Sequence, residues 1–189
     1  MTNVSIMHML VIEMIKRDPY KRTANLLGAF TLTLTDRMRD ATEEAAGFGA
    51  TAPAALVQIG SYPGESIGML RLSLGLGQSA TSRLVGRLFN HGLVEKAPGP
   101  DSRQIALSLT PLGEEAKERV LASRQEILSC ALKRLTAEEQ DSLTSILEKL
   151  LNQMVGSRSE SDSICRLCDI LACPQDLCPA EPNAEPTAS

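Results

Sequence analysis

Four cysteines near the carboxyl end of the chain are the residues whose type and spacing suggest chemistry most directly. They fall within fourteen residues in the pattern C-x2-C-x4-C-x4-C, and they are Cys165, Cys168, Cys173 and Cys178. A shell of four thiolates suits a zinc ion, and it also suits an iron–sulfur cluster. Clustered thiols in a cytoplasmic chain favour metal binding over structural disulfides. A thiol redox switch and a segment with no role remain open as alternatives.

The intervals between these cysteines resemble those of a zinc knuckle in which cysteine takes the place of the usual histidine. The glycine and aromatic positions of the knuckle are not matched in this chain. We expect zinc as the cofactor, with an iron–sulfur cluster or a thiol redox switch as the alternatives. The fifth cysteine, Cys130, stands alone on the apolar side of an expected helix and should be a small buried residue.

The sequence offers little material for catalysis. His8 and His91 are its two histidines, and His91 beside Gly92 fits a helix C-terminus better than a ligand position. No Ser/His/Asp or Cys/His set can be assembled from so few histidines, and the sequence has no glycine-rich loop for phosphate. We therefore expect that the protein is not an enzyme.

The stretch from Ser66 to Thr110 predicts two short helices joined by a tight turn. Residues 67–74 form the first expected helix, and the Gly75-Leu76-Gly77 sequence closes it. The second helix is expected from about Ser79 to Asn90. Its apolar residues fall at helical spacing and predict one narrow buried stripe, Leu84, Val85 and Leu88. Five polar residues are left to point outward: Gln78, Ser79, Ser82, Arg83 and Arg87.

A two-stranded hairpin is expected after the second helix. Residues 93–97 and 104–109 are the expected strands, and the Pro98-Gly99-Pro100-Asp101 sequence between them has strong turn chemistry. Ile105, Leu107 and Leu109 alternate with polar or small residues, so one face of the second strand should be buried. Two helices, a hairpin and a further helix in this order form a winged helix. The expected fold class is mainly α with a small β-hairpin wing.

Three short sequences in this region resemble the MarR family of bacterial transcription regulators. They are Gly92-Leu93-Val94, Asp101-Ser102-Arg103 and Leu109-Thr110-Pro111-Leu112-Gly113. The resemblance covers roughly residues 25–154, and it is specific because these elements occur together. It implies a winged helix-turn-helix domain whose second helix enters the DNA major groove. One departure is Gly86, where the family usually carries a polar residue; a glycine within a helix costs on the order of 1 kcal/mol relative to alanine.

The resemblance also implies roles for the residues that face DNA. The expected DNA-binding residues are Gln78, Ser79, Ser82, Arg83, Arg87, Asp101 and Arg103. We expect the two serines and Arg83 to contact base edges, and Arg87 and Arg103 to contact phosphates or the minor groove. Asp101 would hold Arg103 in position by a charge-assisted hydrogen bond.

The distribution of charge is compatible with a nucleic-acid partner. The chain has a formal net charge of −4 at pH 7, and residues 156–189 carry two basic and six acidic side chains, which account for that whole charge. Residues 62–113 carry five basic and three acidic side chains, a local charge of +2. The overall acidity is therefore no argument against contact with phosphates.

Long amphipathic helices are expected on both sides of the winged helix. Apolar residues at steps of three and four predict helices at about residues 27–47 and 111–134, and Thr136-x-x-Glu139 is a capping box that starts a last helix. The last helix carries an apolar stripe that needs a partner: Leu143, Ile146, Leu147, Leu150, Leu151 and Met154. Because little core remains within the chain, we expect an intersubunit helical bundle and a homodimer. The resemblance implies the same dimer.

The expected organisation has five segments. They are an N-terminal arm at 1–23, a dimerisation helix at 24–50, a winged helix-turn-helix DNA-binding domain at 51–110, C-terminal dimerisation helices at 111–155, and a tail at 156–189 with a polar linker, the cysteine segment and a disordered end. The apolar run at residues 4–15 is too short to span a bilayer, and basic residues follow it instead of preceding it. We expect a cytoplasmic protein with no membrane role.

Together these features predict a homodimeric, sequence-specific transcriptional regulator that binds double-stranded DNA, in the form of a ligand- or redox-responsive repressor. The resemblance implies a small phenolic or aromatic effector, because such acids often bind regulators of this family. The alternative is a metal- or redox-sensing module that uses its winged helix for contacts with proteins. A salt-dependent affinity for DNA would separate these two functions.

Overall fold

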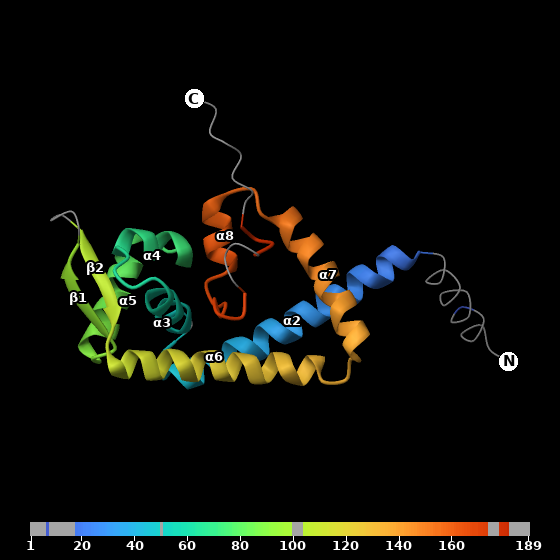
Figure 1. Cartoon of the computed structure of the whole chain (residues 1–189), viewed down its shortest axis with the longest axis horizontal. Coiled ribbons are helices and arrows are strands. Elements are labelled where there is room, and N and C mark those ends of the chain that lie inside the picture. The colour runs from blue at the N-terminus through green and yellow to red at the C-terminus, as the bar shows by residue number, and fades with distance from the viewer. Residues whose placement is uncertain (1–6, 8–17, 50, 100–103, 174–177, 182–189) are drawn as a thin grey trace, which may run out of the picture. The chain divides into compact units, whose positions relative to one another are not determined.

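The structure is a computed structural model that describes residues 7, 18–49, 51–99, 104–173 and 178–181 of the chain. The chain divides into two compact units, Met1–Met38 and Arg39–Ser189. The elements labelled in Figure 1 are α2 (Pro19–Ala46), α3 (Ala52–Ser61), α4 (Ile67–Leu74), α5 (Gln78–Asn90), β1 (Val94–Pro98), β2 (Ile105–Leu109), α6 (Pro111–Leu132), α7 (Ala137–Met154) and α8 (Arg158–Ile164). A mainly helical chain with one small hairpin confirms the expected fold class.

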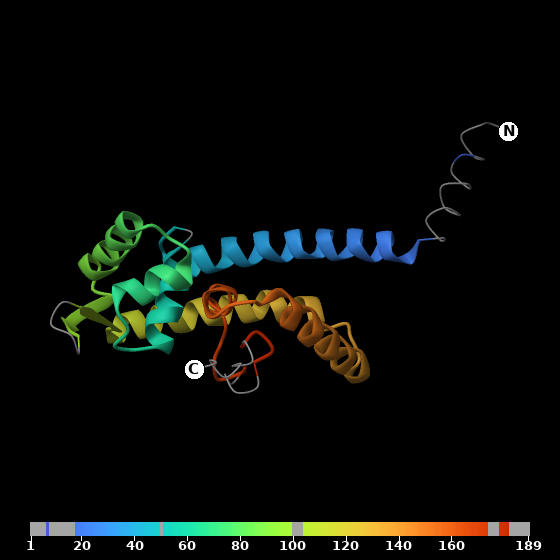
Figure 2. The same cartoon turned by 90° about the horizontal axis from the view of Figure 1, so that it is seen from above.

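Helix α2 is one continuous helix (Figure 2). It begins at Pro19, because proline fits the first helical turn, and Asp18 Oδ1 accepts a hydrogen bond from the Lys21 N–H at 3.2 Å. It ends at Ala46, where Gly47 follows with a left-handed φ of +70° that suits a helix C-terminus. The helix expected in this region is confirmed, and its start lies earlier than its apolar pattern indicated.

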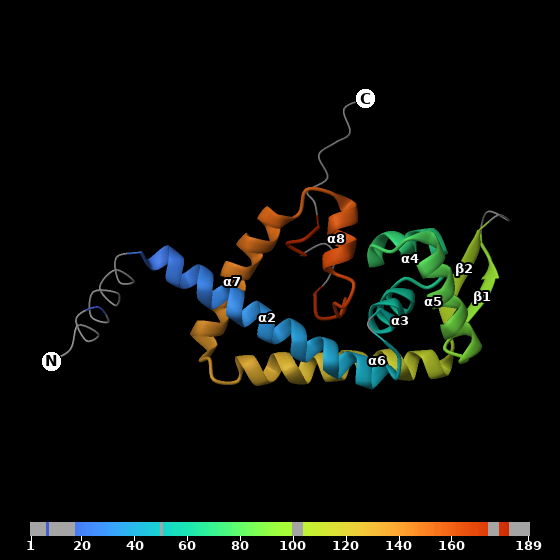
Figure 3. The ribbon, with the colours of Figure 1, turned by 180° about the vertical axis from the view of Figure 1, so that it is seen from behind.

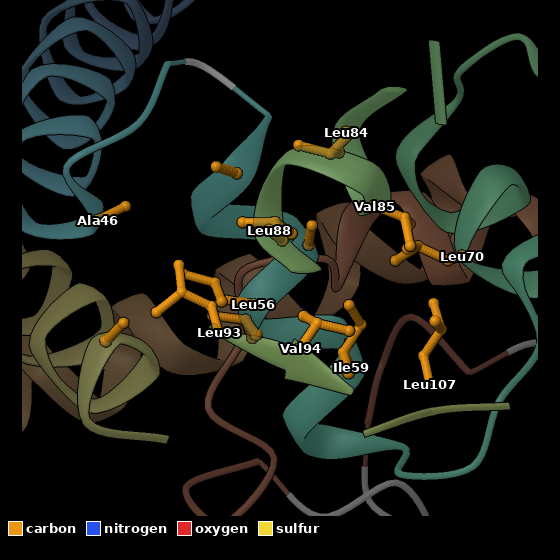
Figure 4. Close-up of a cluster of buried hydrophobic side chains, with 14 of the residues drawn as sticks. Ala46, Leu56, Ile59, Leu70, Leu84, Val85, Leu88, Leu93, Val94 and Leu107 are labelled. Carbon is orange, nitrogen blue, oxygen red and sulfur yellow. The ribbon is translucent and has the colours of Figure 1, made fainter. Parts of the chain in front are cut away.

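One hydrophobic core organises the second unit (Figure 4). Helix α3 lies at its centre, with every residue from Ala52 to Ile59 buried. Leu84, Val85 and Leu88 of α5 are at most 2% exposed, which confirms the predicted stripe. The hairpin and α6 complete the core with Val94, Leu107, Ala116 and Val120. Each fully buried leucine or valine contributes about 1.5–3 kcal/mol relative to an exposed one, so this core fixes how α5 is presented.

Helices α4 and α5 form the expected helix-turn-helix pair. Ser66 caps α4 by accepting a hydrogen bond from the Met69 N–H to its Oγ at 3.3 Å. Gly75 ends α4 in the left-handed conformation at φ +61°, and the Leu76 N–H donates to the Arg71 carbonyl oxygen at 3.1 Å. Glycine adopts this φ at no steric cost, so the chain turns at once into α5. Both predicted helices are confirmed, with α5 starting one residue early at Gln78.

Strands β1 and β2 form the antiparallel hairpin, with Val94 opposite Leu109 and Pro98 opposite Ile105. Leu107 is 1% exposed, as its alternation predicted, but Ile105 is 43% exposed. The prediction of a wholly buried face is therefore wrong at Ile105. The reason is its place at the tip end of β2, the end of the strand next to the turn.

The segment before α4 adds to the hairpin in a way that the sequence did not indicate. The Leu107 N–H donates to the Glu65 carbonyl oxygen at 3.0 Å, and the Gly64 N–H donates to the Leu107 carbonyl oxygen at 2.8 Å. Ser66 and Ala106 form an isolated antiparallel bridge beside them. These bonds tie the start of the helix-turn-helix pair to the wing.

The junction between the hairpin and α6 explains the sequence Thr110-Pro111-Leu112-Gly113. Thr110 Oγ1 donates to the Gly92 carbonyl oxygen at 2.5 Å and accepts from the Gly113 N–H at 3.1 Å, so one side chain joins the end of α5 to the cap of α6. A Cβ at Gly113 would lie 2.0 Å from the Leu93 carbonyl oxygen. Glycine is required here because α6 starts directly against the wing.

Helix α6 packs against α3 (Figure 3). Ala116 and Val120 in its first half are fully buried. Cys130 in its second half is exposed, so the prediction of a buried cysteine is wrong. The second half of this 22-residue helix runs past the 10-residue α3, which covers only the first half.

Helix α7 begins with the predicted capping box. Thr136 Oγ1 accepts from the Glu139 N–H at 3.3 Å, and Glu139 Oε2 accepts from the Thr136 N–H at 2.9 Å. The structure describes the whole helix and buries none of its residues. The apolar residues of its stripe that are 39–70% exposed are Ile146, Leu147, Leu150 and Met154.

Residues 156–163 were expected to be a polar linker, and this prediction is wrong. Arg158–Ile164 forms α8, which Ser157 caps by accepting from the Glu160 N–H at 3.3 Å. Helix α8 contacts α4, and Figure 1 shows it between α4 and α7. A short helix of mixed polar residues carries no strong apolar period, so packing rather than pattern determines it. Apart from Met7, the apolar run at 4–15 lies outside the described residues, as do residues 182–189.

Candidate functional site

Helix α5 presents the polar face that the sequence predicted. The five residues predicted for this face are all exposed: Gln78, Ser79, Ser82, Arg83 and Arg87. Their positions are fixed because the opposite side of the same helix is anchored in the core. Gly77 precedes the helix and has no side chain to cap it, which leaves the first backbone N–H groups of α5 uncapped by a side chain. A helix N-terminus with this composition favours negative charge and can approach a phosphate.

A groove of about 570 Å³ runs along α5 on this exposed side. Its lining residues are Thr51, Leu76, Ala80, Arg83, Leu84, Gly86, Arg87 and Asn90. The two arginines lie one helical turn apart, so both guanidinium groups serve the same strip of surface. A Cβ built on Gly86 would meet nothing within 4 Å, so no packing within the chain requires a glycine there.

The two predicted residues of the wing tip, Asp101 and Arg103, lie outside the described residues. The described part of the wing adds one cation that sequence reasoning had not assigned to the site. The Lys96 Nζ lies 4.6 Å from the centroid of the Phe89 ring, in a cation–π contact between β1 and the last turn of α5. His91 caps the end of α5, as expected.

The four cysteines of the tail line one small cavity of about 30 Å³. Cys165 Sγ lies 4.0 Å from Cys178 Sγ, and Cys168 and Cys173 line the same space. Within the part of the chain that the structure describes, no three Cys, His, Asp or Glu side chains are arranged to hold a metal ion as they stand. The structure thus brings the four predicted residues around one space, without the arrangement of a formed metal site.

The cysteine cluster has one thiol that ionises readily. A hydrogen bond from the Cys165 thiol lowers the pKa of Cys168 to about 6, against the opposing effect of burial. The same hydrogen bond, together with burial, raises the pKa of Cys165. Burial also raises the pKa of Cys173. Because the thiolate is the nucleophilic and ligating form of cysteine, the lowered pKa of Cys168 favours its ligating form near neutral pH.

Residues from α3 and α8 complete the surroundings of the cluster, and sequence reasoning had missed them. Gln58 and Tyr62 line the cavity from the winged-helix side. Burial raises the pKa of the Tyr62 phenol above its usual value. Arg158 pairs with Asp162 at 3.1 Å and also with Glu181. The only signal in the sequence that could have indicated these ion pairs was the spacing of four residues between Arg158 and Asp162.

Solved structures with the same arrangement of elements come from transcription regulators. The YusO protein from Bacillus subtilis superposes with a TM-score of 0.61 at 24% identity, over 71% of this chain and 95% of that chain. A mutant MarR from E. coli complexed with operator DNA superposes with a TM-score of 0.52 at 25% identity, over 66% of this chain and 93% of that chain. The chain has the fold of a MarR-family winged-helix transcriptional regulator.

A curated relative of this chain is the uncharacterized HTH-type transcriptional regulator YwhA of Bacillus subtilis. It is 32% identical over 76 residues, which are 40% of this chain and 55% of YwhA. The chain thus matches about half the length of that relative. No protein-family model matches the chain. Among the described residues, none of the helices combines the length and the apolar content needed to cross a membrane.

Proposed function

We propose that the protein is a homodimeric transcriptional regulator that binds double-stranded DNA with α5 as its recognition helix. The observation that carries this function is the two-sided character of α5. One side is locked into the core by Leu84, Val85 and Leu88, and the other side presents serines, a glutamine and two arginines to solvent. A rigid helix with an exposed face of hydrogen-bond donors suits insertion into the major groove.

The contacts that we propose differ in kind along α5. Ser79, Ser82 and Arg83 lie in its first half and contact base edges, where an arginine can bond a guanine with two hydrogen bonds. Arg87 lies one turn later and contacts a phosphate, which fixes the register of the helix without reading sequence. The E. coli MarR mutant complexed with operator DNA supports this docking, because its fold matches over most of its length.

The wing extends the proposed contact beyond α5. Lys96 lies on β1 beside Phe89, and its ammonium group adds positive charge next to the recognition helix. The proposed roles of Arg103 in the minor groove and of Asp101 in holding it remain predictions from the family resemblance. Two basic elements side by side would contact adjacent grooves of one duplex.

We propose that two copies of the chain associate through their terminal helices. In α7, Leu147 and Leu150 are 45% and 39% exposed. In α2, Leu27 and Phe30 are 49% and 50% exposed. Long helices with apolar residues left in water are the usual material of an intersubunit bundle. The resemblance to the MarR family implies such a dimer, and a two-fold axis would present two copies of α5 to one duplex.

A small aromatic or phenolic acid remains the effector that the resemblance implies. A cavity of about 610 Å³ between α6 and the cysteine segment has a suitable size for such a ligand. Leu121 and Ile170 give it apolar walls, and Arg124 supplies a cation that could pair with a carboxylate. A ligand that prefers one arrangement of the dimer would shift the population of DNA-binding forms.

Salt-dependent binding to DNA tests the proposed function. Fluorescence anisotropy of the full chain with a labelled duplex, selected by binding from a random pool, should show tight binding that weakens steeply as salt rises. Each phosphate contact is expected to contribute about −0.9 to the slope of log affinity against log salt. If the selection enriches no duplex and no DNA binding is detected, the proposed function is contradicted. That result would favour the alternative, a metal- or redox-sensing module that uses the winged helix for contacts with proteins.

A further inference from the structure

The cysteine segment, residues 165–178, is the part of the second unit that the proposed contact with DNA does not use. We propose that its four cysteines together bind one zinc ion in a tetrahedral site seated on the winged-helix domain. The ligands are Cys165, Cys168, Cys173 and Cys178, which line one cavity in the structure. This inference goes beyond the proposed function and does not depend on it.

Two local turns bring the first three cysteines to the same side of the chain. Cys165 ends α8, and the Cys168 N–H donates to the Cys165 carbonyl oxygen at 2.8 Å, which forms a tight turn between them. Asp169 Oδ1 then accepts from the Leu171 N–H at 2.9 Å, and the Cys173 N–H donates to the Asp169 carbonyl oxygen at 3.2 Å. Both turns form from backbone and aspartate groups and need no metal.

The fourth cysteine is brought back by contacts outside the sulfur cluster. Arg158, at the start of α8, pairs with Glu181, which lies three residues beyond Cys178. Ala180 is 1% exposed, so the chain next to Cys178 is held against the domain. Leu167 packs against the hydrophobic core on the other side of the segment. The frame of the proposed site is therefore fixed at both ends by an ion pair and by apolar packing.

The spacing and the size of the cavity favour a single ion. Four sulfurs around zinc at about 2.3 Å lie roughly 3.8 Å from one another, by tetrahedral geometry. Cys165 Sγ and Cys178 Sγ lie 4.0 Å apart. A cavity of about 30 Å³ has room for one or two atoms of water size, which is too little for a cluster of four irons and four sulfides.

The donor set decides which metal is expected. Four soft thiolates select zinc over magnesium or calcium, which prefer oxygen ligands. A disulfide would use two of the four thiols and would need sulfurs at about 2.05 Å, half the separation of Cys165 and Cys178. A structural zinc uses all four cysteines at once, which matches a cavity that all four line.

Metal binding requires a small rearrangement of side chains. Cys173 lines the cavity but is exposed, whereas the other three cysteines of the cluster are partly buried, so its side chain must move further into the cavity to complete the shell. A change of rotamer moves a cysteine sulfur without moving the backbone. The site is therefore close to, but not at, the geometry of the bound form.

Elemental analysis of the full, untagged chain tests the proposal. Protein purified under reducing conditions without added metal is expected to contain about one zinc per chain. Cys165→Ser and Cys178→Ser should each lower this value below roughly a tenth, while Cys130→Ser, on α6 and outside the cluster, should leave it unchanged. Circular dichroism of the same samples shows whether each variant keeps its helices, so that loss of zinc is not confused with loss of fold.

A thiol titration of the Cys130→Ser variant gives an independent readout. Four cysteines remain in this variant, and with metal bound none should react with a thiol reagent, whereas all four should react after a strong chelator is added. Cobalt(II) should replace zinc and give the visible absorption of a tetrahedral thiolate site. Less than about a tenth of an equivalent of zinc with reactive thiols, iron with acid-labile sulfide, or unchanged zinc in the two serine variants would each overturn the proposal.

Discussion

Helices α5 and α7 carry similar apolar stripes, but the stripe of α5 is buried and the stripe of α7 is exposed. In α5, Leu84 and Leu88 are at most 2% exposed, and the polar face of the helix is turned outward. In α7, no residue is buried, and Leu147 and Leu150 stay 45% and 39% exposed. The apolar stripe of α5 therefore packs against the core of its own chain, whereas the described residues leave the apolar stripe of α7 uncovered.

This difference assigns different tasks to the two helices. The buried stripe of α5 serves the fold, because it sets the position of Arg83 and its neighbours relative to the wing. The exposed stripe of α7 leaves apolar surface in water, which a soluble chain usually covers with a partner. We propose that a second copy of the chain covers it, and each prediction below tests one side of this contrast.

The largest effect is expected from charges placed in the α7 stripe. Leu147→Glu combined with Leu150→Glu should give a monomer in analytical ultracentrifugation, because two carboxylates cannot be buried in an apolar interface without partners. Loss of the second DNA-binding helix should lower the affinity for operator DNA by at least about 100-fold.

The matched control adds the same two charges to the opposite face of α7. Ser145→Glu with Asn152→Glu lies about half a helical turn away from the stripe, so this variant should remain a dimer and keep its affinity for DNA. A stable, folded dimer in the Leu147/Leu150 variant would refute the assignment of α7 to the interface.

The next largest effect is expected in the α5 stripe. Leu88→Ala removes a side chain that is 0% exposed, so it should lower the free energy of unfolding by about 2–5 kcal/mol. This loss should not depend on protein concentration, because Leu88 packs within one chain. The effect of Leu147→Ala on the melting midpoint should depend on protein concentration, because Leu147 lies in the proposed dimer interface. Thermal unfolding at several protein concentrations separates the two. A loss below about 1 kcal/mol for Leu88→Ala would mean that α5 is not anchored as described.

A smaller effect is expected on the polar face of α5. Arg83→Ala should weaken binding to the selected duplex by about 1–3 kcal/mol and relax base preference at one or two positions. Anisotropy titrations against single-base variants of the duplex would measure both changes. Arg134→Ala, an exposed arginine beyond the end of α6, is the control and should bind as the unaltered chain does. If the Arg83→Ala and Arg134→Ala variants bind the duplex equally well, Arg83 does not contact DNA as proposed.

The smallest effect is expected at Gly86. Gly86→Ala should raise the free energy of unfolding by about 0.5–1 kcal/mol, because alanine favours helix and the added Cβ meets nothing within 4 Å. Gly28→Ala in α2 also has open space around its Cβ and should give a similar gain. Chemical denaturation of both variants checks the values. A destabilised Gly86→Ala beside a stabilised Gly28→Ala would reveal a constraint on the α5 backbone.

The sequence predicted the local elements well, because their signals are local. The capping box at Thr136, the glycine at the end of α4 and the apolar stripe of α5 each act over a few residues. The hairpin was also predicted, but the exposure of Ile105 was not, since the core ends before it. The two backbone hydrogen bonds that join Leu107 to Gly64 and Glu65 link residues far apart in the sequence, and no local pattern encodes them.

The candidate sites divide in the same way. The outward face of α5 followed directly from helical periodicity, once its buried stripe was recognised. The four cysteines were recognised by type and spacing, but their contact with the winged helix was not. That contact depends on α8 and on the pairing of Arg158 with Glu181, where the sequence had indicated only a polar linker. The exposure of Cys130 was missed because apolar periodicity does not show how far a neighbouring helix extends.

The most direct test of the central claim is selection of bound duplexes from a random pool by the full chain, followed by sequencing. A homodimer that reads DNA with two copies of α5 predicts an inverted repeat, with half-site centres about one helical turn, 10 base pairs, or a multiple of it apart. The Leu147/Leu150 glutamate variant should lose this repeat. Enrichment of a single half-site without a symmetric partner by the unaltered chain, or no enrichment at all, would contradict the account.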